Sequence, residues 1–291
     1  MTFFQDLISV LLSGILIGAT YAAMSYGLGI IYGVMRVINL VHAGIITAAA
    51  YLAFWMFSAF RIDPIIASVL VMPFFFFFGM GVQKFFISRI YKGPQISSLL
   101  LLFAMWLVIK NIVYLIWTGN DRSILTSYTF KTINIGIPVS YARFAVFLLA
   151  VIISVALYLF LQKTYTGKAI RAIAEDREVC PLAGIDVEWI SMVAFGIGSA
   201  LAAMPGALMS IIYPINPEFG GNFLLKSFAV IILGGMGNMV GILLGGLIIG
   251  VAETASTFYI RSSMQDLVSF LILFLILLFR PSGILGVRIK A

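Results

Sequence analysis

Few residues of this chain have the type and spacing needed for chemistry. The chain has a single histidine, His42, and a single cysteine, which excludes a paired-histidine metal site, a cysteine metal site and an intrachain disulfide. The pair Gly167-Lys168 resembles the end of a phosphate-binding loop. However, Ala169 stands where that loop has Ser or Thr, and Gln162 stands where it has Gly. We therefore expect no ATP site, no metal, no cofactor and no catalytic residue.

The most polar stretch of the chain is residues 163–189, which we call the polar island. It holds four of the 18 Lys and Arg and five of the 11 Asp and Glu, between two long apolar runs. Hydrocarbon does not solvate such a segment, so it must lie in water on one side of a membrane. If 167–179 is helical, its cations and anions oppose the helix dipole, which costs roughly 0.3 kcal/mol or more per charge. This pattern favours a surface built to contact lipid headgroups or a partner protein.

The composition is that of a polytopic membrane protein. Hydrophobic residues make up 62% of the chain and charged residues 10%, whereas soluble domains have about 25% charged residues. Apolar runs long enough to span a bilayer occur at 7–33, 43–59, 64–82, 96–117, 141–161, 190–212 and 265–280. The region 225–259 is also apolar but is broken by the stretch 234–238. We predict a single all-α membrane domain over 1–291, with about eight membrane-embedded helical segments, one of them glycine-broken or re-entrant.

The placement of Lys and Arg predicts the orientation. When the spans alternate, 11 of the 18 basic residues lie on one side, which the positive-inside rule makes cytoplasmic. That side holds Arg36, the loop 84–92, the polar island and the tail with Arg280, Arg288 and Lys290. The N-terminus is then outside and the C-terminus inside. The outer side receives Arg61, Arg122, Lys131, Arg143, Lys226 and Arg261.

For the spans to alternate in this way, the region 225–259 must start and end outside, as a hairpin or as a pair of short helices. Basic loops that face anionic lipid explain the net charge of +7. Since no basic patch is interleaved with aromatic residues, we expect no nucleic-acid partner.

Polar residues at membrane depth are the candidates for function. Lys110 and Glu253 are too few and too scattered for a good proton relay, which argues against an ion-coupled secondary transporter. Asn39 and His42 lie three residues apart and would share one face of a short helix. They fit either a capped, hydrogen-bonded turn or a polar lining of a pathway. The break at 234–238 fits either irregular backbone along a wet cavity or a plain turn between two helices.

Glycines spaced at four predict close approach of helix backbones. We expect this packing to be internal, with a subunit interface as the alternative. The spaced groups are Gly14 and Gly18; Gly29 and Gly33; Gly237, Gly241 and Gly245; and Gly246 and Gly250. The run 74–78, which is five consecutive Phe residues, is expected to face lipid.

Four motifs together resemble the membrane-spanning permease subunits of ABC importers for branched-chain amino acids. The likeness covers nearly the whole chain, and the motifs stand in the family's order. They are 27–39 with His42, 166–185, 233–250 and 278–286. Two positions depart from the family's pattern. Ala43 follows the histidine where the family usually has Gly, and Pro181 stands where a small helix-compatible residue is usual.

The resemblance implies a non-catalytic transport subunit in the prokaryotic plasma membrane. A solute-binding protein would deliver leucine, isoleucine or valine from outside. A second homologous permease, as a homodimer or heterodimer, would complete the pathway, and two cytoplasmic ATPases would dock on the polar island. The implied coupling residues are Gly167, Lys168, Arg171, Glu175, Asp176 and Gly184. The implied pathway residues are Asn39, His42, Gly234, Gly235 and Gly237. Import of urea, amides or other amino acids is the nearest alternative, followed by a secondary transporter and by a membrane-embedded enzyme.

Overall fold

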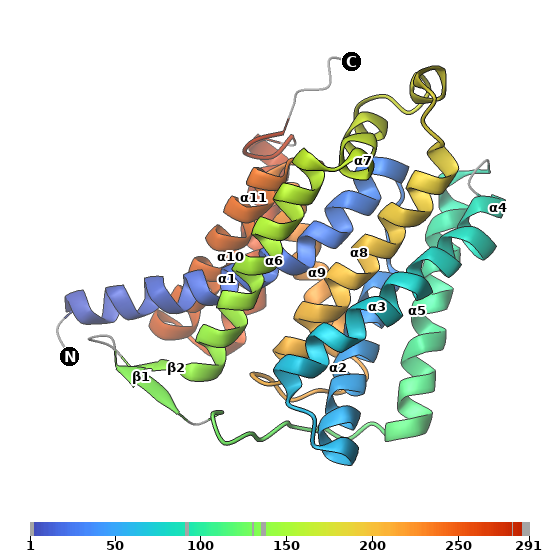
Figure 1. Ribbon diagram of the computed structural model, residues 1–291. Coiled ribbons are helices and arrows are strands. Elements are labelled where there is room, and N and C mark those ends of the chain that lie inside the picture. The colour runs from blue at the N-terminus through green and yellow to red at the C-terminus, as the bar shows by residue number, and fades with distance from the viewer. Residues whose placement is uncertain (1–2, 91–92, 130, 135–137, 281, 287–291) are drawn as a thin grey trace.

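The computed structural model describes residues 3–90, 93–129, 131–134, 138–280 and 282–286 (Figure 1). The basic tail residues Arg288 and Lys290, and Lys92 in the second basic loop, lie outside these residues. The helices are α1 (Phe3–Met35), α2 (Val41–Phe60), α3 (Pro64–Val82), α4 (Ser88–Ile90), α5 (Gln95–Trp117), α6 (Tyr141–Lys163), α7 (Tyr165–Glu175), α8 (Val187–Met209), α9 (Phe219–Gly234), α10 (Met239–Tyr259) and α11 (Gln265–Phe279). A π-helical turn (Gln83–Ile87) joins α3 to α4, and single 3-10 turns lie at Cys180–Ala183 and Ser262–Met264. The two strands are β1 (Thr132–Asn134) and β2 (Pro138–Ser140), which pair antiparallel.

The predicted all-α, membrane-spanning architecture is confirmed. Among the described residues, eight helices are long and apolar enough to cross a membrane. The region 225–259 is divided between α9 and α10, and the turn at 235–238 falls within the predicted break at 234–238. Helix α9 has 16 residues, which gives a length of about 24 Å at 1.5 Å per residue, less than the hydrocarbon core of about 30 Å. It therefore does not cross the bilayer on its own.

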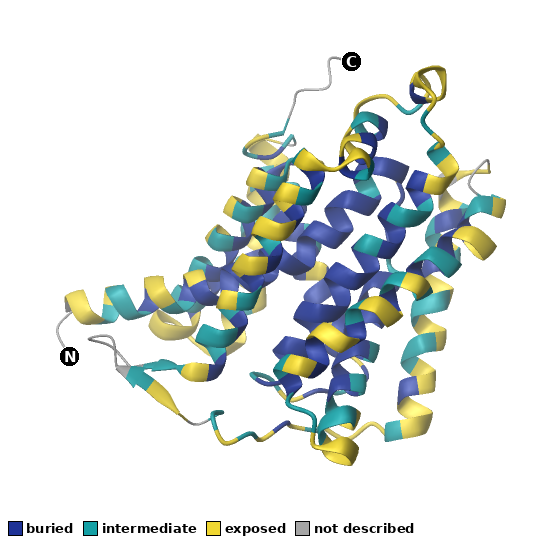
Figure 2. Ribbon diagram, viewed as in Figure 1, coloured by how far each residue is buried: buried dark blue, intermediate teal, exposed yellow. Residues whose placement is uncertain are grey.

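The centre of the bundle is formed by α1, α2 and α8. Helix α1 packs against α10, α8, α6 and α9, and α8 packs against α3 and α2. Figure 2 shows the dark, buried ribbon concentrated in these central helices, while α5 and α11 carry many exposed residues at the edges. The exposed side chains of the outer helices are largely apolar, which is expected where lipid or a partner subunit covers them.

The phenylalanine run of α3 is only partly lipid-facing. Phe74 and Phe77 are exposed, as predicted, but Phe75 is buried in the core. A helix turns about 100° per residue, so five consecutive residues cannot all point to lipid.

The glycines spaced at four in α1 and α10 pack inside the subunit. A Cβ atom at Gly246 would lie 2.7 Å from the carbonyl oxygen of Gly18 and 2.8 Å from the amide nitrogen of Ala22. Both are backbone atoms, which have little room to move. The expectation of internal packing is therefore confirmed for this helix pair.

We predict that Gly246→Val prevents the normal approach of α10 to α1. Overpacking of this kind typically costs about 1–3 kcal/mol. The yield of monodisperse protein in detergent, and its melting temperature, should fall. Gly81→Val in α3 is the matched control, because a Cβ there would meet only the Phe85 ring, at 4.0 Å. Equal behaviour of the two variants would contradict the packing.

The long loop before α6 is fastened to the start of α3. The Tyr128 hydroxyl donates to both carboxylate oxygens of Asp63 at 3.0 Å, and Asp63 also caps α3 by accepting from the Ile65 amide. Burial, followed by this bond to Asp63, raises the pKa of Tyr128 above its usual value near 10. The hydroxyl thus remains a donor at neutral pH.

The polar island and the end of α11 lie at one end of the bundle, and the start of α1 and the β hairpin lie toward the other (Figure 1). This arrangement agrees with opposite sides for the N-terminus and the polar island. The expected placement of Lys226 on the outer side of the membrane is wrong. Lys226 is not in a loop but is buried on α9, with 6% of its surface exposed.

Candidate functional site

Helix α7 is joined to the end of α6 by a tight turn. The Thr164 hydroxyl donates to the Phe160 carbonyl at 2.8 Å, and its oxygen accepts from the Gly167 amide at 3.0 Å. A Cβ atom at Gly167 would lie 2.6 Å from the Cα of Leu161. Arg171 donates from Nε to the Leu161 carbonyl at 3.1 Å. Position 167 therefore needs glycine, and α7 cannot move without the end of α6.

Helix α7 ends earlier than the predicted range 167–179. Its last residue is Glu175, and the Asp176 side chain accepts from the amides of Glu178 and Val179 at 2.9 and 3.2 Å. Asp176 thus stabilises a turn at the point where the helix would otherwise continue. The shorter helix keeps the predicted order of charges, with Lys168 and Arg171 before Glu175.

The polar island presents an exposed surface that is not only polar. Of the predicted coupling residues, Gly167 is buried, while Lys168, Arg171, Glu175, Asp176 and Gly184 are exposed. Sequence reasoning missed two large apolar side chains beside them, Leu182 and Tyr165, which are 87% and 71% exposed. Exposed apolar groups rimmed by charges are typical of a protein interface.

The end of α1 is tied to the polar island. Arg36 donates from Nη2 to the Ala174 carbonyl at 3.1 Å, and Arg177 donates from Nη1 to the Val34 carbonyl at 3.0 Å. Arg36 has a positive φ of 54°, which ends α1 and redirects the chain toward α2. A movement of α7 would therefore act directly on the segment 36–40.

The side chains of Asn39 and His42 are buried, and their polar atoms make no hydrogen bond to the described residues. Both residues are 0% exposed. The Met24 carbonyl lies near the His42 ring but not in hydrogen-bond geometry. Asn39 precedes α2, so the two residues do not share a helix face as expected. The turn before α2 is closed by the bond from the Ala43 amide to the Leu40 carbonyl at 3.3 Å, and neither the Asn39 nor the His42 side chain caps it.

The glycine break is a turn between α9 and α10. Gly235 and Gly237 have φ of 99° and 89°, a region open mainly to glycine. Asn238 caps α10 by accepting from the Gly241 amide, and donates to the Leu285 carbonyl at 3.0 Å. The Ile284 amide donates to the Leu233 carbonyl at 2.8 Å. The break is therefore a turn held by the closing motif, and its residues Gly237 and Asn238 also line the cavity described below. Gly234 and Gly235 pack against backbone there.

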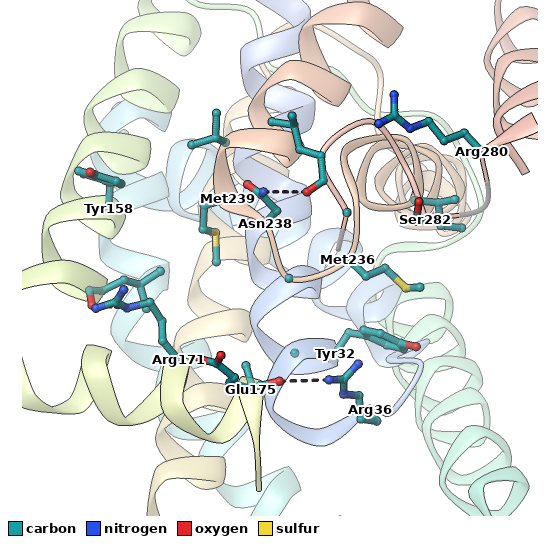
Figure 3. A pocket seen from close by; sticks show the side chains of 18 of the residues that line it. Tyr32, Arg36, Tyr158, Arg171, Glu175, Met236, Asn238, Met239, Arg280 and Ser282 are labelled. Atoms are coloured by element: carbon teal, nitrogen blue, oxygen red, sulfur yellow. Dashed lines mark hydrogen bonds between the residues drawn. The ribbon is translucent and has the colours of Figure 1, made fainter. Parts of the chain in front are cut away.

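One cavity of about 1300 Å³ brings the four sequence motifs together (Figure 3). Each motif contributes to its lining, including two predicted coupling residues and one predicted pathway glycine. The lining residues include Arg36 from the first motif, Arg171 and Glu175 from the second, Gly237 and Asn238 from the third, and Arg280 and Ser282 from the fourth. Pro281 of the closing motif lies outside the described residues. Other predicted residues, among them Asn39 and His42, do not line this cavity.

Comparison with known proteins decides the family. The family model described as "branched-chain amino acid transport system / permease component" matches residues 10–277. The chain belongs to this family. The resemblance drawn from the four motifs is thus confirmed, and the permease is a multi-pass membrane protein.

Two relatives named as branched-chain amino acid permeases match nearly the whole chain, and a ribose permease matches part of it. BraD of Pseudomonas aeruginosa, named a high-affinity branched-chain amino acid transport system permease protein, is 30% identical over 95% of this chain and 94% of its own. LivH of Escherichia coli K12, which carries the same description, is 28% identical over 94% of both chains. The ribose import permease RbsC of Bacillus subtilis is 28% identical over 60% of this chain and 55% of its own. No solved structure matches the chain significantly.

The permease also contains a buried ionic cluster, which we define as Tyr21, Lys226, Glu253, Asp266 and Ser269 with Gln265. Lys226 Nζ lies 3.0 Å from a carboxylate oxygen of Glu253 and 3.1 Å from one of Asp266. The same Glu253 oxygen accepts from the Tyr21 hydroxyl at 2.7 Å and from Gln265 at 2.9 Å. Its other oxygen accepts from Ser269 at 2.5 Å.

This cluster joins four elements of the permease, since its members come from α1, α9, α10 and α11. Glu253 is 2% exposed, while the Asp266 side chain is 63% exposed. A buried charge is tolerated when it is paired and fully hydrogen-bonded, as Glu253 is here. Lys110, the other ionisable residue expected at membrane depth, forms an ion pair with Glu218, whose side chain is 59% exposed.

Proposed function

We propose that this permease is the membrane subunit of an ATP-driven importer of branched-chain amino acids, namely leucine, isoleucine and valine. It would act with a second homologous permease, two cytoplasmic ATPases and an extracytoplasmic binding protein. The polar island would lie in the cytoplasm and the N-terminus outside, in the prokaryotic plasma membrane. The meeting of all four motifs around one cavity, in a chain of this family, carries the proposal.

Energy would enter through α7. Its exposed residues Lys168, Arg171 and Glu175, with Asp176 and Gly184 beyond it, would contact the ATPase, and Leu182 would supply an apolar anchor. The buried face of α7 rests on the bundle through Gly167 and Ile170. A displacement of the ATPase would thus be passed to the ends of α6 and α1 through the hydrogen bonds of Arg171 and Arg36.

The pathway residues would respond at the end of this chain of contacts. A buried polar group without a partner costs about 1–3 kcal/mol, so Asn39 and His42 would favour a second conformation in which water or substrate reaches them. Movement of Arg36 would favour that conformation, because the segment 36–40 connects Arg36 to Asn39 and to the start of α2. The backbone of Gly234, Gly235 and Gly237 would form the cytoplasmic mouth.

Asn39→Leu tests this role of the pathway residues. Leu has nearly the same size, so the conformation described here should keep or gain stability, because a buried unpaired amide is removed. Leucine uptake should fall by about tenfold, if one charge-free hydrogen bond near 1.4 kcal/mol is lost in transport. Melting temperature and uptake are the two readouts. An unchanged uptake rate would show that Asn39 is only a packing residue.

The overall proposal is tested by uptake of radiolabelled leucine into right-side-out vesicles that hold this permease with its candidate partners and enclose ATP on the cytoplasmic side. Uptake should require ATP and the binding protein, and should survive an ionophore. Uptake by the permease alone that collapses with the ion gradient would instead establish a secondary transporter. Competition by unlabelled urea, amides and other amino acids ranks the alternative substrates.

A further inference from the structure

The cavity around the four motifs lies at the level where several membrane helices end. Helix α1 ends at Met35, α6 at Lys163 and α11 at Phe279, and residues at or beside each of these ends line the cavity. The cavity is therefore placed at the boundary between hydrocarbon and water. Figure 3 shows its labelled side chains drawn from the ends of separate elements around one space.

The charge of this lining is strongly one-sided. Three arginines, Arg36, Arg171 and Arg280, face a single acidic residue, Glu175. Arg36 and Arg171 each use one nitrogen on a backbone carbonyl, which leaves further guanidinium donors. The Arg280 side chain has no hydrogen bond or ion pair to the described residues. The cavity thus holds cationic donors that no carboxylate of the described chain neutralises.

The rim of the same cavity is apolar. Phe279 is 79% exposed, Val240 54% and Met236 48%, and Tyr158 on α6 is also exposed. A lining that combines cationic donors with exposed apolar side chains matches an amphipathic anion. A soluble anion would have no use for the apolar rim, and a purely apolar ligand would leave the arginines unpaired.

We propose that this cavity binds the phosphate headgroup of an anionic phospholipid, with its acyl chains along the exposed apolar rim. Basic pockets between membrane helices on the cytoplasmic side suit such headgroups, and guanidinium binds phosphate oxygens in bidentate geometry. The site rests on the proposed cytoplasmic placement of this end. A bound headgroup would bridge α7 and the α9–α10 turn, so the lipid would tune the coupling between them.

Binding is measured on the purified full chain after delipidation, by native mass spectrometry and by thermal stabilisation. The probes are phosphatidylglycerol, phosphatidylcholine and inorganic phosphate. Both lipids carry a phosphate, but phosphatidylcholine would also place its choline cation beside the three arginines. Phosphatidylglycerol should therefore bind at least about tenfold more tightly than phosphatidylcholine. Arg280→Gln should remove most of this preference, and Arg280→Lys should restore part of it.

Arg89→Gln is the matched control, since Arg89 is exposed on the same basic side but does not line the cavity. Equal affinity for the two lipids would overturn the proposal, as would an equal loss in Arg280→Gln and Arg89→Gln. Protection by inorganic phosphate as strong as that by phosphatidylglycerol would also overturn it, because the lipid chains would then contribute nothing. The assay needs neither ATPase nor transport, so its failure is distinct from failure of the importer proposal.

Discussion

Gly167→Ala should uncouple ATP hydrolysis from transport while the membrane helices stay folded. The added methyl group would meet the backbone of Phe160 and Leu161, neither of which can yield without moving α6. We expect α7 to move away from its contact with the end of α6. Overpacking costs about 1–3 kcal/mol, and coupling energies of that size correspond to about a 5- to 150-fold change. Gly167→Pro also removes the amide that donates to Thr164, so its effect should be larger.

Leucine uptake and substrate-stimulated ATP hydrolysis are measured side by side on the reconstituted complex. Gly33→Ala is the matched control, because a Cβ there would lie 3.5 Å from the Ala174 Cβ, an ordinary contact beside the same helix. The exchange Arg171→Glu with Glu175→Arg gives a second test, since it preserves net charge but inverts the pattern on α7 and removes the bond to Leu161. Normal uptake by both variants would contradict the docking role of α7.

Removal of either partner of the Lys226–Glu253 pair should destabilise the permease strongly. Loss of one partner of a buried ion pair costs about 3–5 kcal/mol, because the other charge stays buried. Glu253→Gln also weakens the bonds from Tyr21 and Ser269. We expect a lower melting temperature for Glu253→Gln and for Lys226→Met. The double variant should recover much of the loss.

The Lys110–Glu218 pair supplies the control for this prediction. Its side chains are 28% and 59% exposed, and exposed pairs contribute about 0–1 kcal/mol. Lys110→Met should therefore change the melting temperature far less than Lys226→Met. If the two lysine variants behave alike, the buried cluster does not stabilise the packing of α9.

Much of the fold follows from the sequence because hydropathy is a local property. The runs near 43–59 and 96–117 lie within α2 and α5, and the break at 234–238 separates α9 from α10. The predicted apolar region begins at residue 225, whereas α9 begins at Phe219, because tertiary packing extends the helix into Gly220, Gly221 and Asn222. Helix α9 therefore began too late in the prediction, and Lys226 was placed outside.

The ionic cluster could not be predicted for a related reason. A hydropathy sum treats Lys226 and Glu253 as two separate charges, because they lie 27 residues apart in the chain. In the folded chain they form an ion pair. Only the packing of α9 against α10 and α11 brings them together. A lysine within an otherwise apolar run, followed by a glutamate in the next run, is the signal that could have identified the pair.

The residues of the candidate site could be predicted from the sequence only where they belong to the four motifs. The four motifs named Arg36, Arg171, Gly237 and Arg280, which all line one cavity, but no periodicity indicates that distant motifs meet. Leu182 was missed because a single leucine in a polar segment carries no pattern. Its exposure depends on the turn that Asp176 and Pro181 impose after α7.

The most direct test of energy entry through the polar island is labelling of Leu182→Cys in a Cys180→Ser background with a membrane-impermeant thiol reagent. The variant is studied in oriented vesicles, with the ATPase subunits present and after they are stripped. The account predicts labelling only from the cytoplasmic side, and strong protection when the ATPases are bound. Labelling from the outer side, or equal labelling with and without the ATPases, would contradict it.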